Sequence, residues 1–189
     1  MLPRISILCA LLFSSACACA QVVPAGYEGR HLLTAGGLFS YFDADYASNK
    51  VMGVGTYVDW TPPMFFHLGA EGEARWLTLN GANSFSEYDY LIGPRYTFPM
   101  KGRLRPYAKV LAGAGEINFP YHLAHGGYLA IAPGGGVDYT WSSRLRVRAD
   151  YEYQFWPKAV GIPEIPSSSL KPNGVSVGIS YAIFKGRTF

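Results

Sequence analysis

The stretch RLRVRADYEYQFWPK, residues 144–158, combines dense charge with a strict two-residue alternation. Its even-numbered positions from 144 to 154 are charged or polar, and its odd-numbered positions from 145 to 155 are apolar or aromatic. Because successive side chains of a β-strand point to opposite faces, this pattern predicts a strand with one charged face and one apolar face. A half-buried strand of a soluble protein alternates in the same way, so the remainder of the chain has to show which face meets water.

The composition indicates a chain rich in apolar residues that are spread out by alternation. The 189 residues suffice for one domain, and only 15% of them are charged, well below the roughly 25% of an ordinary soluble domain. Aromatic residues also make up 15%, with 14 Tyr and 11 Phe, and the mean hydropathy is slightly positive. Beyond the N-terminal segment, no run reaches the ~20 apolar residues that a transmembrane helix needs. The net charge of +3 is too small to indicate a nucleic-acid-binding protein.

The N-terminal segment has the organisation of a secretory signal peptide. An arginine precedes an apolar run at 5–13, and the sequence Ala-Cys-Ala at 18–20 is a small-residue cleavage pattern. We therefore expect residues 1–20 to be a cleaved signal peptide and residues 21–189 to form a single exported domain.

All three cysteines lie inside this predicted signal peptide. The exported domain is therefore predicted to contain no disulfide and to gain its stability elsewhere. A lipoprotein signal, with Cys17 or Cys19 as the lipidated residue, is an alternative that the sequence leaves open.

Eight alternating runs follow, separated by clusters of Gly, Pro, Asn and Ser. They are about 10–15 residues long, which exceeds the usual strand of about 5–6 residues and fits strands tilted across a membrane. The alternation is ambiguous in phase only for the first run. The predicted strands are 31–43, 51–60, 65–79, 87–98, 104–115, 127–141, 144–158 and 174–184.

The connections between these runs alternate in character. Those near 61–63, 99–103 and 141–144 are short, whereas the others are longer and more polar. Short turns at one end and longer loops at the other are typical of bacterial outer-membrane barrels. We therefore predict an all-β fold, an eight-stranded antiparallel transmembrane up-and-down β-barrel. A soluble barrel or sandwich with its apolar face inside is the alternative.

The charged faces of the third to seventh runs carry equal numbers of acids and bases. An eight-stranded barrel is just wide enough for side chains to fill it, and unpaired buried charge is costly, so we expect these residues to neutralise one another in the lumen. A balanced interior also argues against an ion-selective pore, which needs a ring of one sign. The predicted lumen network consists of Glu71, Glu73, Arg75, Asp89, Arg95, Arg105, Lys109, Asp138, Arg146, Arg148, Asp150 and Glu152.

The opposite faces carry large aromatic residues, several of them near strand ends. In a membrane barrel such residues face lipid or form girdles at the two interfaces. The predicted lipid-facing and girdle residues are Trp60, Trp76, Tyr88, Tyr90, Phe98, Trp141, Tyr151, Tyr153, Phe155 and Tyr181.

The signal peptide, the eight alternating runs and the ending GISYAIF at 178–184 together resemble the small eight-stranded outer-membrane barrels of the OmpA, OmpX and opacity-protein kind. This resemblance implies a location in the Gram-negative outer membrane and a final strand closed by an aromatic residue that the barrel-assembly machinery reads. Either Phe184 or Phe189 fits that position. It also implies outer-membrane lipid, lipopolysaccharide, periplasmic chaperones and the assembly machinery as partners.

No residue pattern indicates chemistry. His122 and His125 lie in a predicted loop without a nearby acid or cysteine, and Glu71 and Glu73 have Arg75 beside them, which favours an ion-pair ladder. We predict no catalytic, metal or cofactor site, no nucleic-acid partner and a monomer.

The sequence therefore favours a non-catalytic barrel with a plugged, charge-paired interior and a structural or surface-interaction role. Three other functions stay open. They are a loop-mediated adhesin, for which 157–173 is the best loop, a lipid-modifying outer-membrane enzyme, and a small porin.

Overall fold

A computed structural model of the chain describes residues 32–43, 45, 50–62, 67–78, 86–100, 102–118, 125–159 and 168–185. The predicted signal peptide and its cleavage site lie outside these residues.

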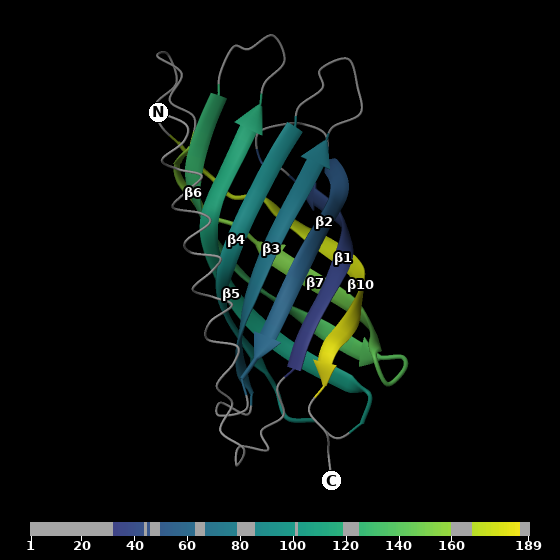
Figure 1. Ribbon diagram of the computed structural model, residues 1–189. Helices are drawn as coiled ribbons and strands as arrows, with labels where there is room; N and C mark the ends of the chain where they lie inside the picture. The colour runs from purple at the N-terminus through teal and green to yellow at the C-terminus, as the bar shows by residue number, and fades with distance from the viewer. Residues whose placement is uncertain are drawn as a thin grey trace, which may run out of the picture.

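The chain forms a closed antiparallel β-barrel of eight strands, which confirms the predicted fold class (Figure 1). Around the barrel the strands follow the order β1-β10-β7-β6-β5-β4-β3-β2, so consecutive barrel strands are neighbours and the last strand closes on the first. The barrel strands are β1 (Leu32–Asp43), β2 (Val51–Thr61), β3 (Leu68–Thr78), β4 (Ser86–Thr97), β5 (Leu104–Asn118), β6 (His125–Thr140), β7 (Leu145–Tyr153) and β10 (Asn173–Lys185).

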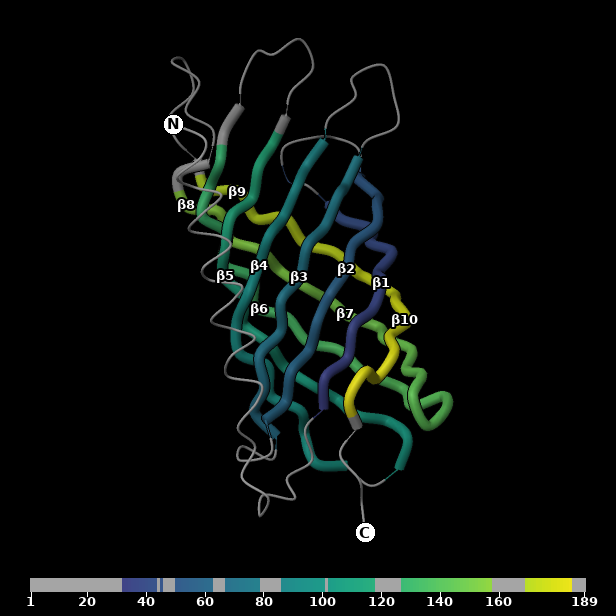
Figure 2. The backbone as a smooth tube through the Cα atoms, in the orientation of Figure 1, coloured from purple at the N-terminus to yellow at the C-terminus, as the bar shows by residue number. Residues whose placement is uncertain are grey.

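The strands are long and tilted, as membrane-crossing strands are. In the tube view β10, β7 and β6 pass behind β1 to β4 at an angle (Figure 2). Among the described residues, no helix is long and apolar enough to cross a membrane.

The run that predicted the seventh strand divides into two elements. β7 ends at Tyr153, and β8 (Trp156–Ala159) then pairs with β9 (Ser168–Leu170) in a small separate sheet. Phe155 makes one bridge to Ile131 of β6 between them. The predicted loop 157–173 therefore contains part of a hairpin that leaves the barrel wall at the end of β7.

The connections after β2, β4 and β6, which the sequence predicted to be short, have six, six and four residues, and those after β1, β3 and β5 have seven, seven and six. The predicted contrast in length therefore holds only for the turn after β6 and for the 19 residues between β7 and β10. The connections after β2, β4 and β6 lie at the end of the barrel where β1 begins and β10 ends (Figure 1). Gly102 in the turn before β5 has a φ of 118°, a conformation that residues with a side chain rarely adopt. We call this end the short-turn end and the opposite one the loop end; in outer-membrane barrels the short turns face the periplasm.

Alternation places most charged side chains of the predicted network inside together with some apolar ones, and it leaves large apolar side chains on the outside. In β1, whose phase the sequence left ambiguous, Leu38, Ser40 and Phe42 are buried, whereas Phe39 and Tyr41 are exposed. Between β1 and β10 the small side chains of Ser40 and Ser176 face the interior, and their hydroxyl oxygens are hydrogen-bonded at 2.8 Å.

Candidate functional site: the barrel interior

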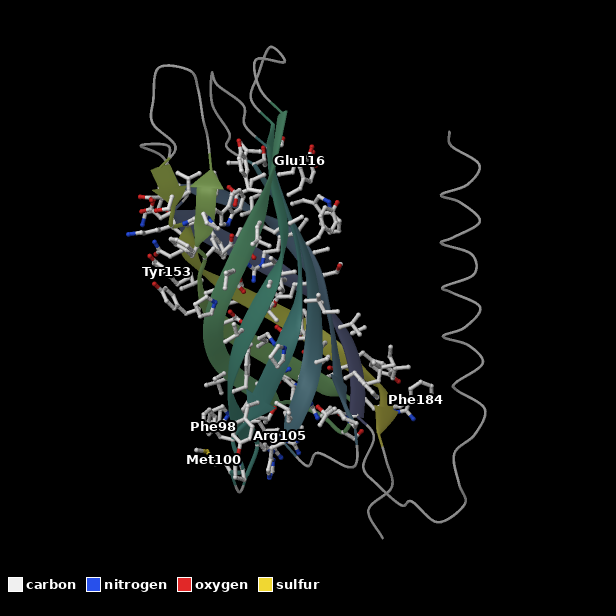
Figure 3. All side chains as sticks on the ribbon, turned by 90° about the vertical axis from the view of Figure 1, so that its left-hand side faces the viewer. Phe98, Met100, Arg105, Glu116, Tyr153 and Phe184 are labelled. Carbon is white, nitrogen blue, oxygen red and sulfur yellow. The ribbon has the colours of Figure 1, made fainter. Side chains whose placement is uncertain are left out.

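The inward faces bring together most of the residues that the sequence assigned to the lumen. Eleven of the twelve are buried: Glu71, Glu73, Arg75, Asp89, Arg95, Lys109, Asp138, Arg146, Arg148, Asp150 and Glu152. Arg105 departs from the expectation. It has the inward phase of β5, but it is the second residue of that strand and lies at the end of the barrel, where its side chain is exposed (Figure 3).

The ammonium of Lys109 lies at the centre of a cage of carboxylates. Its Nζ is 2.9 Å from Glu71 Oε1 and 2.5 Å from Glu73 Oε1, both on β3. On the other side it is 2.9 Å from Asp150 Oδ2 and 3.2 Å from Glu152 Oε2, both on β7. One cation from β5 therefore joins two strands that are each two positions away around the barrel.

Two arginines span the full width of the interior. β3 and β7 are opposite one another in the strand order, four steps apart in either direction. Arg75 of β3 donates to both carboxylate oxygens of Glu152 on β7, at 2.6 and 2.9 Å. Arg148 of β7 donates in the reverse sense to Glu71 Oε2 on β3 at 3.0 Å.

Toward the short-turn end, Arg148 and Arg95 share their acids. Arg148 donates to Asp59 Oδ2 at 2.6 Å and to Asp138 Oδ1 at 3.0 Å. Arg95 is paired with the same Asp59 oxygen, and donates to Asp138 Oδ2 at 2.5 Å. The ring of Tyr107 lies under the Arg95 guanidinium, at 3.8 Å from centroid to Cζ. These contacts join β2, β4, β6 and β7 across the interior.

Sequence reasoning missed two buried acids, Asp59 and Glu87. Asp59 lies on β2, which was read only for its apolar face; its position between Val58 and Trp60 gives it the inward phase and was a usable signal. Glu87 is the first residue of the predicted run 87–98, where a side chain is expected to be solvated, but β4 begins one residue earlier and buries it.

These additions change the predicted charge balance. Six acids against six bases were expected, but the buried charged residues of the described chain are eight acids and five bases. The acids are Asp59, Glu71, Glu73, Glu87, Asp89, Asp138, Asp150 and Glu152, and the bases are Arg75, Arg95, Lys109, Arg146 and Arg148. The interior is thus extensively paired and also rich in acid.

Three of these acids are close enough together to suit a metal ion. Carboxylate oxygens of Glu71, Glu73 and Asp150 all lie within 4.8 Å of one another. Lys109 Nζ contacts each of the three, so the ammonium supplies the positive charge at this place. His122 and the side chain of His125 lie outside the described residues.

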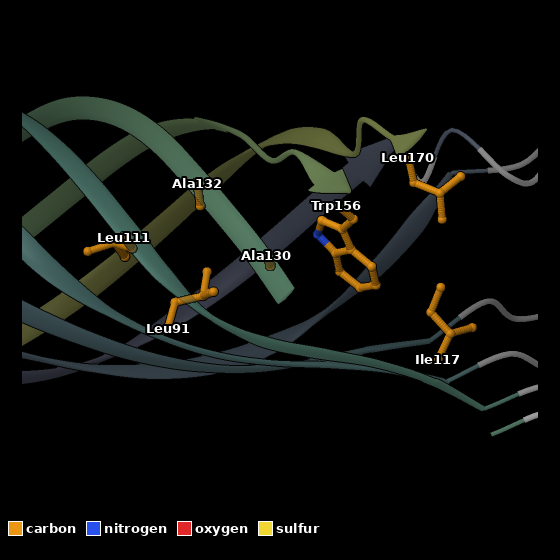
Figure 4. Close-up of a cluster of buried hydrophobic side chains, with 7 residues drawn as sticks. All are labelled: Leu91, Leu111, Ile117, Ala130, Ala132, Trp156 and Leu170. Atoms are coloured by element: carbon orange, nitrogen blue, oxygen red, sulfur yellow. The ribbon is translucent and has the colours of Figure 1, made fainter. Parts of the chain in front are cut away.

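An apolar cluster occupies the interior nearer the loop end (Figure 4). Trp156 of β8 is fully buried there and packs against the partly buried Tyr128, with ring centroids 6.0 Å apart. Gly115 lies directly beneath the indole, because a Cβ at that position would be 2.4 Å from Trp156 ring atoms. The cluster consists of Leu91, Leu111, Ile117, Ala130, Ala132, Trp156 and Leu170.

Gln154 connects the apolar cluster to the charges. It accepts a hydrogen bond from Trp156 Nε1 at 2.7 Å and donates to Asp89 Oδ2 at 3.1 Å and to Glu152 Oε1 at 3.0 Å. The Trp156 indole is thereby oriented by the same network that holds Arg75.

The aromatic residues assigned to the outer face lie on the outside of the barrel. Tyr88 is half-buried and the other nine are exposed; Trp141, at the turn between β6 and β7, is the most exposed of these at 69%. The nine are Trp60, Trp76, Tyr90, Phe98, Trp141, Tyr151, Tyr153, Phe155 and Tyr181.

A closed barrel of eight long, tilted strands, with an apolar aromatic wall and a charged interior, defines the class of eight-stranded outer-membrane barrels. The chain belongs to the outer membrane protein β-barrel domain family, whose model matches residues 6–182. It is accordingly an outer-membrane protein, as its resemblance implied. No curated protein sequence matches the chain.

Three solved structures illustrate the shared fold. Neisserial surface protein A has a TM-score of 0.62 and 11% identity, over 80% of this chain and 96% of that one. Ail, the attachment invasion locus protein of Yersinia pestis, has a TM-score of 0.54 and 16% identity, over 82% and 99%. The N-terminal β-barrel domain of Pseudomonas aeruginosa OprF has a TM-score of 0.54 and 13% identity, over 82% and 99%. None of the three is named as an enzyme.

Proposed function

We propose that the protein is a plugged outer-membrane barrel with a structural or surface-interaction role, and that it neither conducts solutes nor catalyses a reaction. The observation that carries this proposal is the pair of contacts across the full diameter, Arg75 with Glu152 and Arg148 with Glu71. A barrel of eight strands leaves an interior just wide enough for side chains, and here opposite walls are joined through hydrogen-bonded ions.

The apolar cluster adds a second obstruction in series with the charged one. A permeating ion entering from the loop end would have to pass the buried Trp156 and Ile117, which fill the interior at the level of Glu87 and Asp89, the register partners of Ile117 and Gly115. The two zones together support a filled interior rather than a water-filled channel.

The test is single-channel recording in planar lipid bilayers. We expect no steady conductance from the unmodified protein. The matched control is the double variant Arg75→Ser/Arg148→Ser, which removes both cross-diameter contacts and is expected to raise conductance if it folds, as judged by heat-dependent gel mobility. A steady, sign-selective conductance of the unmodified protein would contradict the proposal.

In this function the barrel's partners are outer-membrane lipid and lipopolysaccharide along its wall, and periplasmic chaperones and the barrel-assembly machinery during biogenesis. Phe184 is exposed near the end of β10 and suits the closing aromatic position that assembly requires; Phe189 lies outside the described residues. One copy suffices, because the interior is filled from a single chain.

Binding through the loop end is a second candidate, favoured by the hairpin of β8 and β9. Burial of Trp156 and Leu170 fixes both strands of this hairpin to the barrel, so the segment 160–167 between them has a rigid base. Exchange of 160–167 for a Gly/Ser linker, followed by a cell-adhesion assay, tests this role. Unchanged adhesion would exclude this segment as the binding element.

A further inference from the structure

The exposed charges are distributed unequally between the two ends of the barrel. At the loop end both signs occur, since the exposed residues there include Asp43, Asp45 and Glu116 as well as Lys50 and Lys171. At the short-turn end, the exposed charged residues that the structure describes are all arginines: Arg103, Arg105 and Arg144.

Arg103 and Arg144 lie in the turns before β5 and β7, and Arg105 lies at the second position of β5. We call these three exposed residues the arginine patch. Arg103 accepts a backbone hydrogen bond from Thr140 at 2.8 Å, and Thr140 is in turn the register partner of Arg146. Arg144 accepts one from Ala182 of β10, also at 2.8 Å. The patch therefore extends along one side of the barrel rim from β5 to β10.

The acid nearest in register does not neutralise the patch. Asp138 is opposite Arg105 in the β5–β6 ladder, but both of its oxygens are engaged by Arg148 and Arg95. Within the described part of the chain, no carboxylate forms a salt bridge with an arginine of the patch; the salt bridges that are present all belong to the interior network. The guanidinium groups thus retain donors for an external anion.

The contacts of Arg144 show on which side of the wall its guanidinium lies. Its Nη1 donates to the hydroxyl of Tyr181 at 2.7 Å, and Tyr181 is an outward-facing residue of β10. A guanidinium has five N–H groups in a fixed fork, so several remain available beyond this bond. Arg144 is therefore held on the outer, lipid-facing side of the rim.

Exposed apolar side chains surround the patch. Trp141 lies in the same turn as Arg144, and it is exposed. Phe98 and Met100 lie in the turn that contains Arg103, and Leu104 follows that arginine directly; these three are exposed as well (Figure 3). Aromatic and aliphatic groups next to arginines match the boundary between acyl chains and headgroups. A soluble anion would match the arginines but not this apolar border.

We propose that the arginine patch binds the phosphate of an anionic phospholipid in the periplasmic leaflet. The Arg144 guanidinium binds the headgroup phosphate through charge-assisted hydrogen bonds on the outer side of the rim, and the exposed Arg103 and Arg105 add positive charge at the rim beside it. Trp141, Leu104 and Tyr181 contact the glycerol and upper acyl region. This goes beyond the general contact of a barrel wall with lipid, because it assigns a headgroup charge and a place on the wall.

The experiment uses Trp141 as its own reporter. In the variant Trp60→Phe/Trp76→Phe, the remaining tryptophans are the exposed Trp141 and the fully buried Trp156, so quenching by brominated acyl chains reports on lipid beside the patch. The folded protein is placed in phosphatidylcholine vesicles that contain either brominated phosphatidylglycerol or brominated phosphatidylcholine. We expect phosphatidylglycerol to be preferred at least about fivefold, the factor that one arginine near an anionic surface contributes.

In the same background, Arg103→Gln/Arg105→Gln/Arg144→Gln is expected to lower this preference to about one. The control Lys50→Gln/Lys171→Gln removes positive charge at the other end and should leave it unchanged, as should an excess of soluble glycerol phosphate. Equal quenching by the two lipids in the background protein would overturn the proposal and indicate a periplasmic polyanion or protein instead. Loss of the preference in the lysine control, or in soluble glycerol phosphate, would overturn the assignment to this lipid site.

Discussion

The barrel interior has two zones of equal burial and opposite chemistry. Around Lys109 and Arg148, side chains are held by ions that each contact three or four partners. Around Trp156, side chains are held by shape, with one hydrogen bond from the indole to Gln154. Burial alone therefore does not set the consequence of a substitution. In the charged zone it depends on which partners remain, and in the apolar zone on how well the space refills.

The largest expected effect is in the charged zone. Arg148→Met keeps much of the side-chain volume but removes the cation that Asp59, Glu71 and Asp138 share. Because the buried acids already outnumber the bases, we expect a loss of about 5 kcal/mol in the free energy of unfolding, the upper part of the range for breaking a buried pair. Urea unfolding in lipid vesicles, followed by heat-dependent gel mobility, measures it.

The loss should be partly recovered when an acid is removed as well. In Arg148→Met/Glu71→Gln one of the three negative charges that lost a cation is absent, so the double variant should be more stable than the sum of the single losses predicts. The exposed Lys50→Met is the control and should change stability by less than about 0.5 kcal/mol. Simple additivity of the two interior substitutions would show that the pair does not interact.

In the apolar zone, Trp156→Ala is expected to cost about 3–4 kcal/mol, because it removes a fully buried indole and leaves a cavity. No charge substitution should rescue it, in contrast to Arg148→Met. Since the indole fixes β8 to the barrel, protease cleavage between β8 and β9 should also accelerate in vesicle-embedded protein. Trp141→Ala, an exposed tryptophan in a short turn, is the control and should leave that cleavage rate unchanged.

The shape requirement can be tested from the other side of the same contact. Gly115→Ala adds a Cβ that would lie 2.4 Å from the Trp156 ring, so the indole has to shift. We expect a cost of about 1–3 kcal/mol, the usual range for overpacking. The combination Gly115→Ala/Trp156→Leu should recover part of it, whereas Gly127→Ala, which has open space around it, should change little. An unchanged unfolding curve for Gly115→Ala would show that the ring adapts freely.

Much of the charged zone was predictable from the sequence because a period of two residues fixes which face each side chain joins. Glu71, Glu73 and Arg75 follow from that rule without knowledge of partners. The partners themselves did not follow, because they depend on strand register and on which strands lie opposite each other. The partners of Arg148, which are Asp59, Glu71 and Asp138, come from three different strands.

The apolar zone was not predictable for a different reason. Trp156 continues the inward phase of 144–154, but it lies near the end of the predicted strand, next to the predicted loop, where the chain leaves the barrel. Its partners come from β4, β5, β6 and β9, and single Leu, Ile and Ala residues on those strands carry no periodic signal of their own. The indole beside Gly115 is the contact that brings them together.

The smallest expected effect concerns the excess of acid. Asp89 is buried, and of its two oxygens only Oδ2 has a hydrogen-bond partner, Gln154. In Asp89→Asn the amide oxygen can keep that bond while a negative charge disappears from an interior that has eight acids and five bases. We expect the free energy of unfolding to change by less than about 1 kcal/mol. The change should be an increase, because the substitution removes one of the excess negative charges.

Asp138→Asn is the matched substitution, of the same residue type at similar burial. Both oxygens of Asp138 are engaged by guanidinium groups, at 3.0 Å from Arg148 Nε and 2.5 Å from Arg95 Nη2. In Asp138→Asn the amide NH2 would face an arginine N–H, so that two donors oppose each other. We expect the free energy of unfolding to fall by about 2–3 kcal/mol, the range for a hydrogen bond to a charged group. If the two variants unfolded at the same urea concentration, the number of charges in the interior would matter more than their pairing. If Asp89→Asn were the less stable of the two, Asp89 would have to be bound to a cation or proton that the surrounding side chains do not provide.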